Sequence, residues 1–180
     1  MSKYSKWAQV EHSFGKRMLV MALLAPLFLL LLPYLVVGGG AALDRLLGIP
    51  SFYFGAVTLV VGGLITAGGV FFAMWSIVDQ LTRGRGTPLP VMPTRELLTH
   101  GPFRLCRNPM TLGTILMYAG IALAAGTLMG LGIVFILSAL LILYLKRMEE
   151  PELAERFGEV YLAYKREVPF LLPRLWKRKE

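Results

Sequence analysis

The chain has 180 residues, of which 56% are hydrophobic, and its formal net charge is +8. Soluble domains are usually about 45–50% apolar, and long apolar runs of the kind seen here are typical of an integral membrane protein. The basic residues flank these runs, so we interpret the charge as a signal of membrane orientation rather than of nucleic-acid binding.

Metal chemistry is not expected from the sequence. Cys106 is the single cysteine, and His12 and His100 lie far apart in the chain. No cluster of histidine, cysteine and carboxylate residues has the spacing of a metal site.

The N-terminal half is predicted to contain two membrane spans. The first runs from about residue 18 to 37 and includes Pro26 and Pro33, which membrane helices tolerate. It is as long as a span and lacks a cleavage site, so we expect a retained helix rather than a signal peptide. Residues 38–51 are predicted to form a short loop. The second span runs from about 52 to 78, and its glycines favour close helix packing.

The C-terminal half is predicted to hold two further spans. Residues 79–109 are polar and rich in proline and glycine, and apolar sequence returns from residue 110 to about 145. This length suits two closely connected helices, with the hairpin turn at residues 124–130. The expected fold is therefore an all-α integral membrane protein with about four transmembrane helices, the last two forming a helical hairpin.

Basic residues predict the orientation of these spans. Three basic segments alternate with two segments that carry almost no charge, so all three are expected on one side, with both termini in the cytoplasm. From the short length of the chain we expect a prokaryotic inner or plasma membrane. The residues of the three segments are Lys3, Lys6, Lys16 and Arg17; Arg83, Arg85, Arg95, Arg104 and Arg107; and the tail from Lys146 and Arg147 onward.

The tail is predicted to contain a cytoplasmic amphipathic helix. Leu153, Phe157, Tyr161 and Tyr164 recur at spacings of four, four and three, which places them on one helix face. Pro151 suits the first turn of such a helix, and the acids before it complement the helix dipole. Glu149 and Glu150 therefore have two interpretations, as acids of the helix start or as ligand-binding carboxylates at the membrane surface.

Two sequence blocks, about 40 residues apart, carry a family resemblance. They read LLTHGPFRLCRNPMTLG and EEPELAERFGEVYLAYKREVPFLLP. Together they resemble the isoprenylcysteine carboxyl methyltransferase family and the related membrane phospholipid methyltransferases. The matching residues are Gly101, Pro102, Phe103, Arg107, Asn108, Pro109 and Gly113 in the first block, and Glu149, Glu150, Leu153, Phe157, Gly158, Tyr161, Tyr164, Val168 and Pro169 in the second.

The resemblance implies a single membrane methyltransferase domain that uses S-adenosylmethionine and acts on a lipophilic acceptor from the bilayer. Residues 1–86 would supply the N-terminal transmembrane helices, and residues 87–180 the cofactor-binding catalytic half. By position in the motifs, the cofactor-binding residues would be Leu97, Leu98, Phe103, Asn108, Pro109, Met110, Thr111, Glu149 and Glu150.

Catalytic and acceptor residues are implied less directly. Arg107 and Glu150 are the catalytic candidates, since an arginine and glutamates at a membrane interface need a polar ligand or mutual salt bridges. Lys146 and Arg147 are the candidates for binding the acceptor. Leu145 stands where eukaryotic relatives have an arginine linked to the acceptor.

Several functions stay open at this point. Carboxyl O-methylation is the favoured reaction, and phospholipid N-methylation is the alternative. An NADPH-dependent sterol-type reductase is a further alternative. The phosphates of its nucleotide would call for more arginine and lysine around the pocket and for less acid, so the adjacent Glu149 and Glu150 argue against it. A non-enzymatic membrane scaffold is the remaining alternative.

Overall fold

The structure is a computed structural model of the chain, and it describes residues 13–87 and 94–173. Every regular element in these ranges is helical, which confirms the all-α prediction. The described residues form two compact units: unit 1 contains residues 13–21, 72–87, 94–112 and 144–173, and unit 2 contains residues 22–71 and 113–143. Lys3 and Lys6, which contributed to the orientation prediction, lie outside the described residues.

The first helical run is longer and less regular than predicted. It comprises α2 (Phe14–Pro26), the π-helical η1 (Leu27–Leu31), α3 (Leu32–Tyr34), the π-helical η2 (Leu35–Gly39) and α4 (Gly40–Leu46). The first π-helical turn follows Pro26 directly. Because proline lacks an N–H and its ring crowds the preceding turn, a local widening of the helix at this point is expected.

The predicted loop at residues 38–51 is wrong for its first part, because the helix continues to Leu46. The glycines that suggested a loop instead allow close packing. A Cβ on Gly40 would lie 2.6 Å from the Cα of Gly130 in α7. Small residues have this role at the interfaces of membrane helices.

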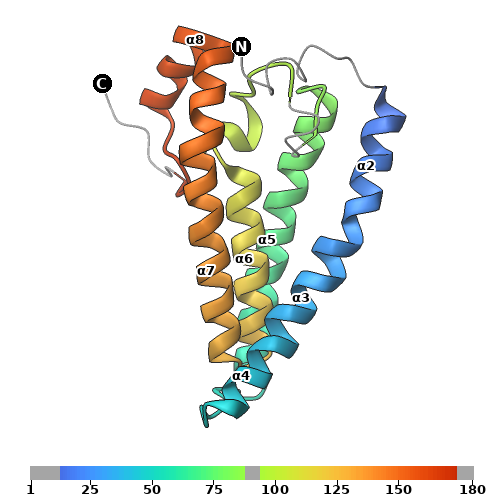
Figure 1. Ribbon diagram of the computed structural model, residues 1–180, viewed down its shortest axis with the longest axis vertical. Helices are drawn as coiled ribbons and strands as arrows, with labels where there is room; N and C mark the ends of the chain where they lie inside the picture. The colour runs from blue at the N-terminus through green and yellow to red at the C-terminus, as the bar shows by residue number, and fades with distance from the viewer. Residues whose placement is uncertain (1–12, 88–93, 174–180) are drawn as a thin grey trace. The chain divides into compact units, whose positions relative to one another are not determined.

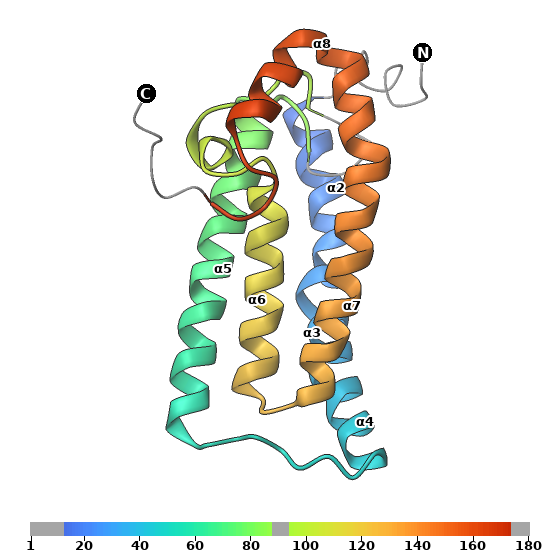
Figure 2. The same ribbon diagram turned by 90° about the vertical axis from the view of Figure 1, so that its left-hand side faces the viewer.

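The remaining helices follow the predicted order. They are α5 (Ala56–Thr82), the 3-10 turn η3 (Gly101–Arg104), α6 (Pro109–Ala124), α7 (Leu128–Tyr144), the π-helical η4 (Leu145–Glu149) and α8 (Glu150–Glu167). A short turn at Gly126 joins α6 to α7, as the hairpin prediction required (Figure 2). Within the described residues, three helical runs are long and apolar enough to cross a membrane, and α6 is a shorter apolar helix.

Unit 2 is built by close contact between helices, and α5, α6 and α7 run side by side in it (Figure 1). A Cβ on Gly62 of α5 would lie 2.6 Å from the main-chain nitrogen of Ala124 in α6. Thr66 donates a hydrogen bond to the carbonyl of Gly62, one turn earlier, at 2.8 Å. Helix interfaces that lack large side chains gain their stability from such backbone approach.

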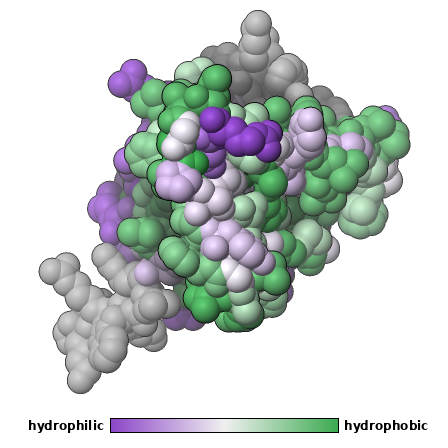
Figure 3. All heavy atoms as spheres, turned by 90° about the horizontal axis from the view of Figure 1, so that it is seen from below, coloured by the Kyte–Doolittle hydropathy of each residue, from purple (hydrophilic) through white to green (hydrophobic). Residues whose placement is uncertain are grey.

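A buried carboxylate fixes the start of α7 within the same unit. Asp44 accepts hydrogen bonds from the Thr127 hydroxyl at 2.6 Å and from the Met129 N–H at 3.0 Å. These bonds satisfy a free N–H at a helix N-terminus, where a negative charge is also favoured. Elsewhere this unit exposes many leucine, valine and phenylalanine side chains, as expected for contact with lipid. Seen from below, the molecule shows hydrophilic residues together with hydrophobic ones (Figure 3).

Candidate functional site

The loop before α6 is held in unit 1 by buried residues. Pro102 and Cys106 are fully buried, and the Tyr164 hydroxyl of α8 donates a 2.6 Å hydrogen bond to the Phe103 carbonyl. Burial raises the pKa of the Cys106 thiol to about 11, partly offset by a hydrogen bond from the main chain of Asn108. The thiol is therefore neutral at physiological pH, and we assign it a packing role.

The two sequence blocks meet through hydrogen bonds to main-chain carbonyls. The N–H of Arg107 donates to the Pro169 carbonyl at 2.9 Å. The Asn108 side-chain amide donates to the Phe170 carbonyl at 3.0 Å. The residues that follow α8 therefore lie against the loop that precedes α6, which brings the two ends of the motif pair together.

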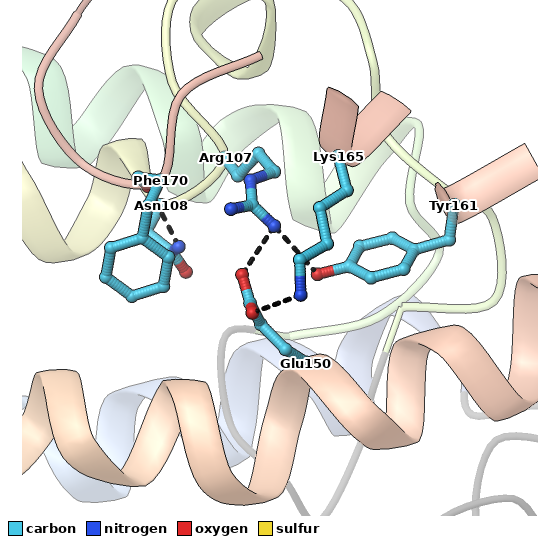
Figure 4. Close-up of polar contacts among 6 residues, drawn as sticks. All are labelled: Arg107, Asn108, Glu150, Tyr161, Lys165 and Phe170. Carbon is cyan, nitrogen blue, oxygen red and sulfur yellow. Dashed lines mark hydrogen bonds and ion pairs between the residues drawn. The ribbon is translucent and has the colours of Figure 1, made fainter. Parts of the chain in front are cut away.

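Four charged or polar side chains form an ion-pair cluster, defined here as Arg107, Glu150, Tyr161 and Lys165 (Figure 4). One oxygen of Glu150 pairs with the Arg107 guanidinium, and the other lies 2.7 Å from the Lys165 ammonium. Arg107 also donates to the Tyr161 hydroxyl at 3.3 Å. The side chains of Arg107 and Glu150 are only 10% and 12% exposed, so each charge depends on the other for compensation.

A break inside α8 makes this cluster possible. In a straight helix, residues 150 and 165 would be separated by roughly 22 Å along the axis, too far for an ion pair. Gly158 has φ 55° and ψ −135°, which interrupts the helical conformation. A positive φ of this kind strongly favours glycine. The chain direction therefore changes at Gly158, and Lys165 reaches Glu150.

Aromatic residues complete the surroundings of the cluster. The guanidinium of Arg107 lies 5.6 Å from the centroid of the Phe170 ring, and the ammonium of Lys146 lies 5.0 Å from it. Both distances allow cation–π attraction. Burial raises the pKa of Tyr161 to about 12 and shifts the pKa of Tyr164 upward as well, so both hydroxyls stay protonated at neutral pH.

Glu149 differs from Glu150 in having no direct partner. Within the described part of the chain its carboxylate forms no hydrogen bond or ion pair. It follows the apolar helix α7, in a stretch that also carries Lys146 and Arg147. Burial, with the nearby Glu152 and Glu150 carboxylates, raises the pKa of Glu149 to about 7, although Arg156 opposes the shift. A cation bound beside Glu149 would favour its charged form.

A second polar contact joins α8 to the loop that follows α5. The Arg156 guanidinium pairs with Glu152 at 2.8 Å and donates to the Thr94 carbonyl. It also lies 4.7 Å from the Phe157 ring centroid. Helix α8 is thus fixed to this loop on one side of Gly158 and to the loop before α6 on the other.

The predicted site residues all belong to unit 1, but they differ in their contacts. Arg107 and Glu150 are in direct contact, and Asn108 contacts the Phe170 carbonyl. Lys146 and Arg147 are exposed, and the structure describes no polar contact between Arg147 and the ion-pair cluster. The remaining candidates are half-buried Leu97 and Leu98 in the loop, Phe103 in η3, and Pro109, Met110 and Thr111 in the first turn of α6.

Sequence reasoning missed Lys165 and Phe170 as members of the site. The helical periodicity placed Lys165 away from the tyrosine face, and Phe170 lies after the predicted helix. The signal for Lys165 was Gly158, since glycine inside a helix often has a packing or conformational reason. No pattern in the sequence predicted that the carbonyls of residues 169 and 170 would accept hydrogen bonds from the first block.

These features define a class of protein: an all-α membrane protein whose polar unit holds a buried carboxylate–guanidinium pair between two motif blocks. The comparison with known families is more specific. A family model described as phospholipid methyltransferase matches residues 57–160, more than half of the chain. The chain therefore belongs to the phospholipid methyltransferase family, and it is a membrane methyltransferase.

The matched region includes both Arg107 and Glu150 but ends before Tyr161. The contacts made by Tyr161, Lys165 and Phe170 thus come from residues beyond the match. No curated protein and no solved structure matched the chain. In residues 13–87 and 94–173, no group of three or more histidine, cysteine, aspartate or glutamate residues is placed to hold a metal ion.

Proposed function

We propose that the protein transfers a methyl group from S-adenosylmethionine to a lipophilic acceptor, with the cofactor held in unit 1 on the cytoplasmic side. The family membership supports methyl transfer, and the ion-pair cluster with its neighbour Glu149 is the observation that supports this cofactor. When bound, the cofactor supplies an activated methyl group, so the protein's main task is to position donor and acceptor.

The donor set of the site fits this cofactor. The amino-acid part of the cofactor carries an ammonium group, which a carboxylate side chain can bind, and a carboxylate, which a guanidinium can bind. Among the described residues, Glu149 offers a carboxylate without a direct partner, and the buried Nε of Arg107 has no hydrogen-bond partner there either. We assign the ammonium to Glu149 and the carboxylate to Arg107, as charge-assisted hydrogen bonds.

The remaining predicted residues have supporting roles in this proposal. Leu97, Leu98, Phe103 and Met110 supply apolar surface for the adenine ring. Glu150 holds Arg107 in place through their ion pair, and Asn108 holds the main chain at Phe170. The acceptor enters from the bilayer. Lys146 and Arg147 are the residues proposed to contact its polar head.

Calorimetry in detergent tests the cofactor assignment. We expect saturable binding of S-adenosylmethionine, no comparable binding of NADPH, and an affinity at least about tenfold lower in Glu149→Ala, because a charge-assisted bond is lost. Glu159→Ala is the control, since Glu159 is an exposed acid of α8, the helix that follows Glu149 directly. Unchanged affinity in both Glu149→Ala and Asn108→Ala would refute the site assignment.

The acceptor has two candidates. Carboxyl O-methylation of a prenylcysteine-like acid is the reaction favoured by the sequence motifs, and N-methylation of a phospholipid amine is favoured by the description of the matched family. Incubation with labelled S-adenosylmethionine and fractionated membrane lipids separates them, because the labelled product is either an ester or an amine. The ester is labile to base, whereas the amine is stable.

A further inference from the structure

A buried carboxylate at the end of α5 plays no part in the site described above. Asp79 lies in the last turn of this helix and is 6% exposed. Its Oδ1 is 3.2 Å from the Arg83 guanidinium, but its Oδ2 is buried and has no hydrogen-bond partner in the part of the chain that the structure describes. A buried charged oxygen without a partner is costly, so this atom calls for a cation or a donor.

The position of Asp79 in its helix strengthens this requirement. The C-terminal end of a helix carries a partial negative charge, which disfavours a carboxylate in the last turn. The one cation described as paired with Asp79 is Arg83, and its side chain is 63% exposed, so water screens the pair. A second cation at Oδ2 would relieve both effects.

Aromatic residues adjoin this carboxylate. Phe72, Trp75 and Asp79 are spaced by three and four residues, which places them on one face of α5. A Cβ added to Gly101 would clash with Asp79 Oδ2 and would lie 3.5 Å from Trp75 Nε1. The Trp75 ring packs edge-on against Phe72, with centroids 6.2 Å apart. The acid and the indole thus converge on one point beside Gly101.

We propose that Asp79 and Trp75 form the binding site for an ammonium head group on the lipid acceptor. A carboxylate next to an aromatic ring is the combination that binds organic ammonium ions. The exposed Arg83 is placed to pair with the phosphate of a zwitterionic head group. A carboxylic acid acceptor would be repelled by Asp79. The inference rests on the proposed methyl transfer and assigns the residue that selects an amine.

The location of this site agrees with such a role. Helix α5 is one of the runs long enough to span a membrane, and Asp79 lies near its polar end, where lipid head groups are found. Gly101 begins the segment that leads to Arg107 and Asn108. The ammonium group would therefore be bound beside the loop that carries the proposed cofactor residues.

Kinetics of Asp79→Asn tests the proposal. We expect KM for phosphatidylethanolamine to rise at least about tenfold, because a charge-assisted contact is lost. The Kd for S-adenosylmethionine should change less than about twofold, and Asp79→Glu should recover part of the loss. Glu96→Gln is the matched control, since Glu96 is an exposed acid of unit 1 that lies 3.9 Å from Arg85. An equal change for a prenylcysteine acid acceptor would overturn the proposal.

A binding measurement keeps the test valid if Asp79→Asn does not fold. The chain has three tryptophans, and replacing Trp7 and Trp176 by phenylalanine leaves Trp75 as the single indole fluorophore. We expect its emission to change saturably with phosphatidylethanolamine and not with phosphatidylglycerol in mixed micelles. An identical response to both lipids, or none to either, overturns the site.

The two proposals fail in different ways. A wild-type protein that does not bind S-adenosylmethionine contradicts the proposed function. A wild-type protein that binds it and methylates a lipid, with the same acceptor preference in Asp79→Asn, contradicts the ammonium site alone.

Discussion

The charges of the ion-pair cluster differ in importance because they differ in exposure. Arg107 and Glu150 are almost completely buried, whereas the Lys165 side chain is 41% exposed. Removing one partner of a buried pair leaves an uncompensated charge, while an exposed partner is largely replaced by water. The Arg107–Glu150 contact is therefore the one on which the stability of the cluster depends.

Arg107→Met and Lys165→Met should have unequal effects on stability. We expect Arg107→Met to lower the free energy of unfolding by about 3–5 kcal/mol, because Glu150 loses its buried partner. Lys165→Met should cost less than about 1 kcal/mol. Unfolding by sodium dodecyl sulfate in mixed micelles measures both. Equal losses would show that Lys165 supplies as much compensation as Arg107 does.

Single glycines decide how the helices are arranged. Gly62 allows the backbone of α5 to approach α6 within unit 2, and Gly158 lets α8 change direction within unit 1. The two glycines act through different physics. A side chain at Gly62 has no space, whereas a side chain at Gly158 meets no atom within 4 Å but is strained by the positive φ.

Adjacent glycines of α5 provide a matched test of helix packing. A Cβ at Gly62 would lie 2.6 Å from main-chain atoms of Gly120 and Ala124, whereas a Cβ at Gly63 would meet nothing within 4 Å. We expect Gly62→Ala to destabilise the protein by about 1–3 kcal/mol through overpacking. Gly63→Ala should be neutral or stabilise it by up to about 1 kcal/mol. Thermal unfolding in detergent compares them, and a similar loss in both would argue against this α5–α6 contact.

The chain as a whole divides its residues between apolar spans and a polar unit. Unit 1 gathers the described basic segments and every predicted site residue, whereas unit 2 contains the hairpin turn and the apolar middle parts of the helices. This division follows the charge pattern of the sequence. It supports the proposal that the polar unit faces the cytoplasm.

Cysteine labelling in sealed vesicles tests that orientation. Cys106 is fully buried and its pKa is raised to about 11, so we expect no background labelling of the native protein. Cysteines introduced at the exposed positions Arg85 and Leu128 should react from opposite sides, with Arg85→Cys reacting from the cytoplasm. Reaction of both from one side would refute the four-span topology.

The sequence by itself determined the helical class and the hairpin turn within residues 124–130, because both rest on local patterns of apolar length and turn residues. The two motif blocks around Arg107 and Glu150 were paired by their resemblance to a known family. The sequence could not show that α4 continues to Leu46, because a glycine that packs against another helix looks the same in sequence as a glycine in a loop.

Only the tertiary structure decided which residues join the site from outside the pattern. Lys165 reaches Glu150 because Gly158 breaks the helix between them, and Phe170 is fixed by a carbonyl that any residue type would supply. Asp79 was likewise recognised only from the structure, because whether its Oδ2 has a hydrogen-bond partner depends on the residues packed around it. Contacts between distant segments depend on where the backbone turns and on which polar groups it leaves unpaired. Local sequence patterns predict neither.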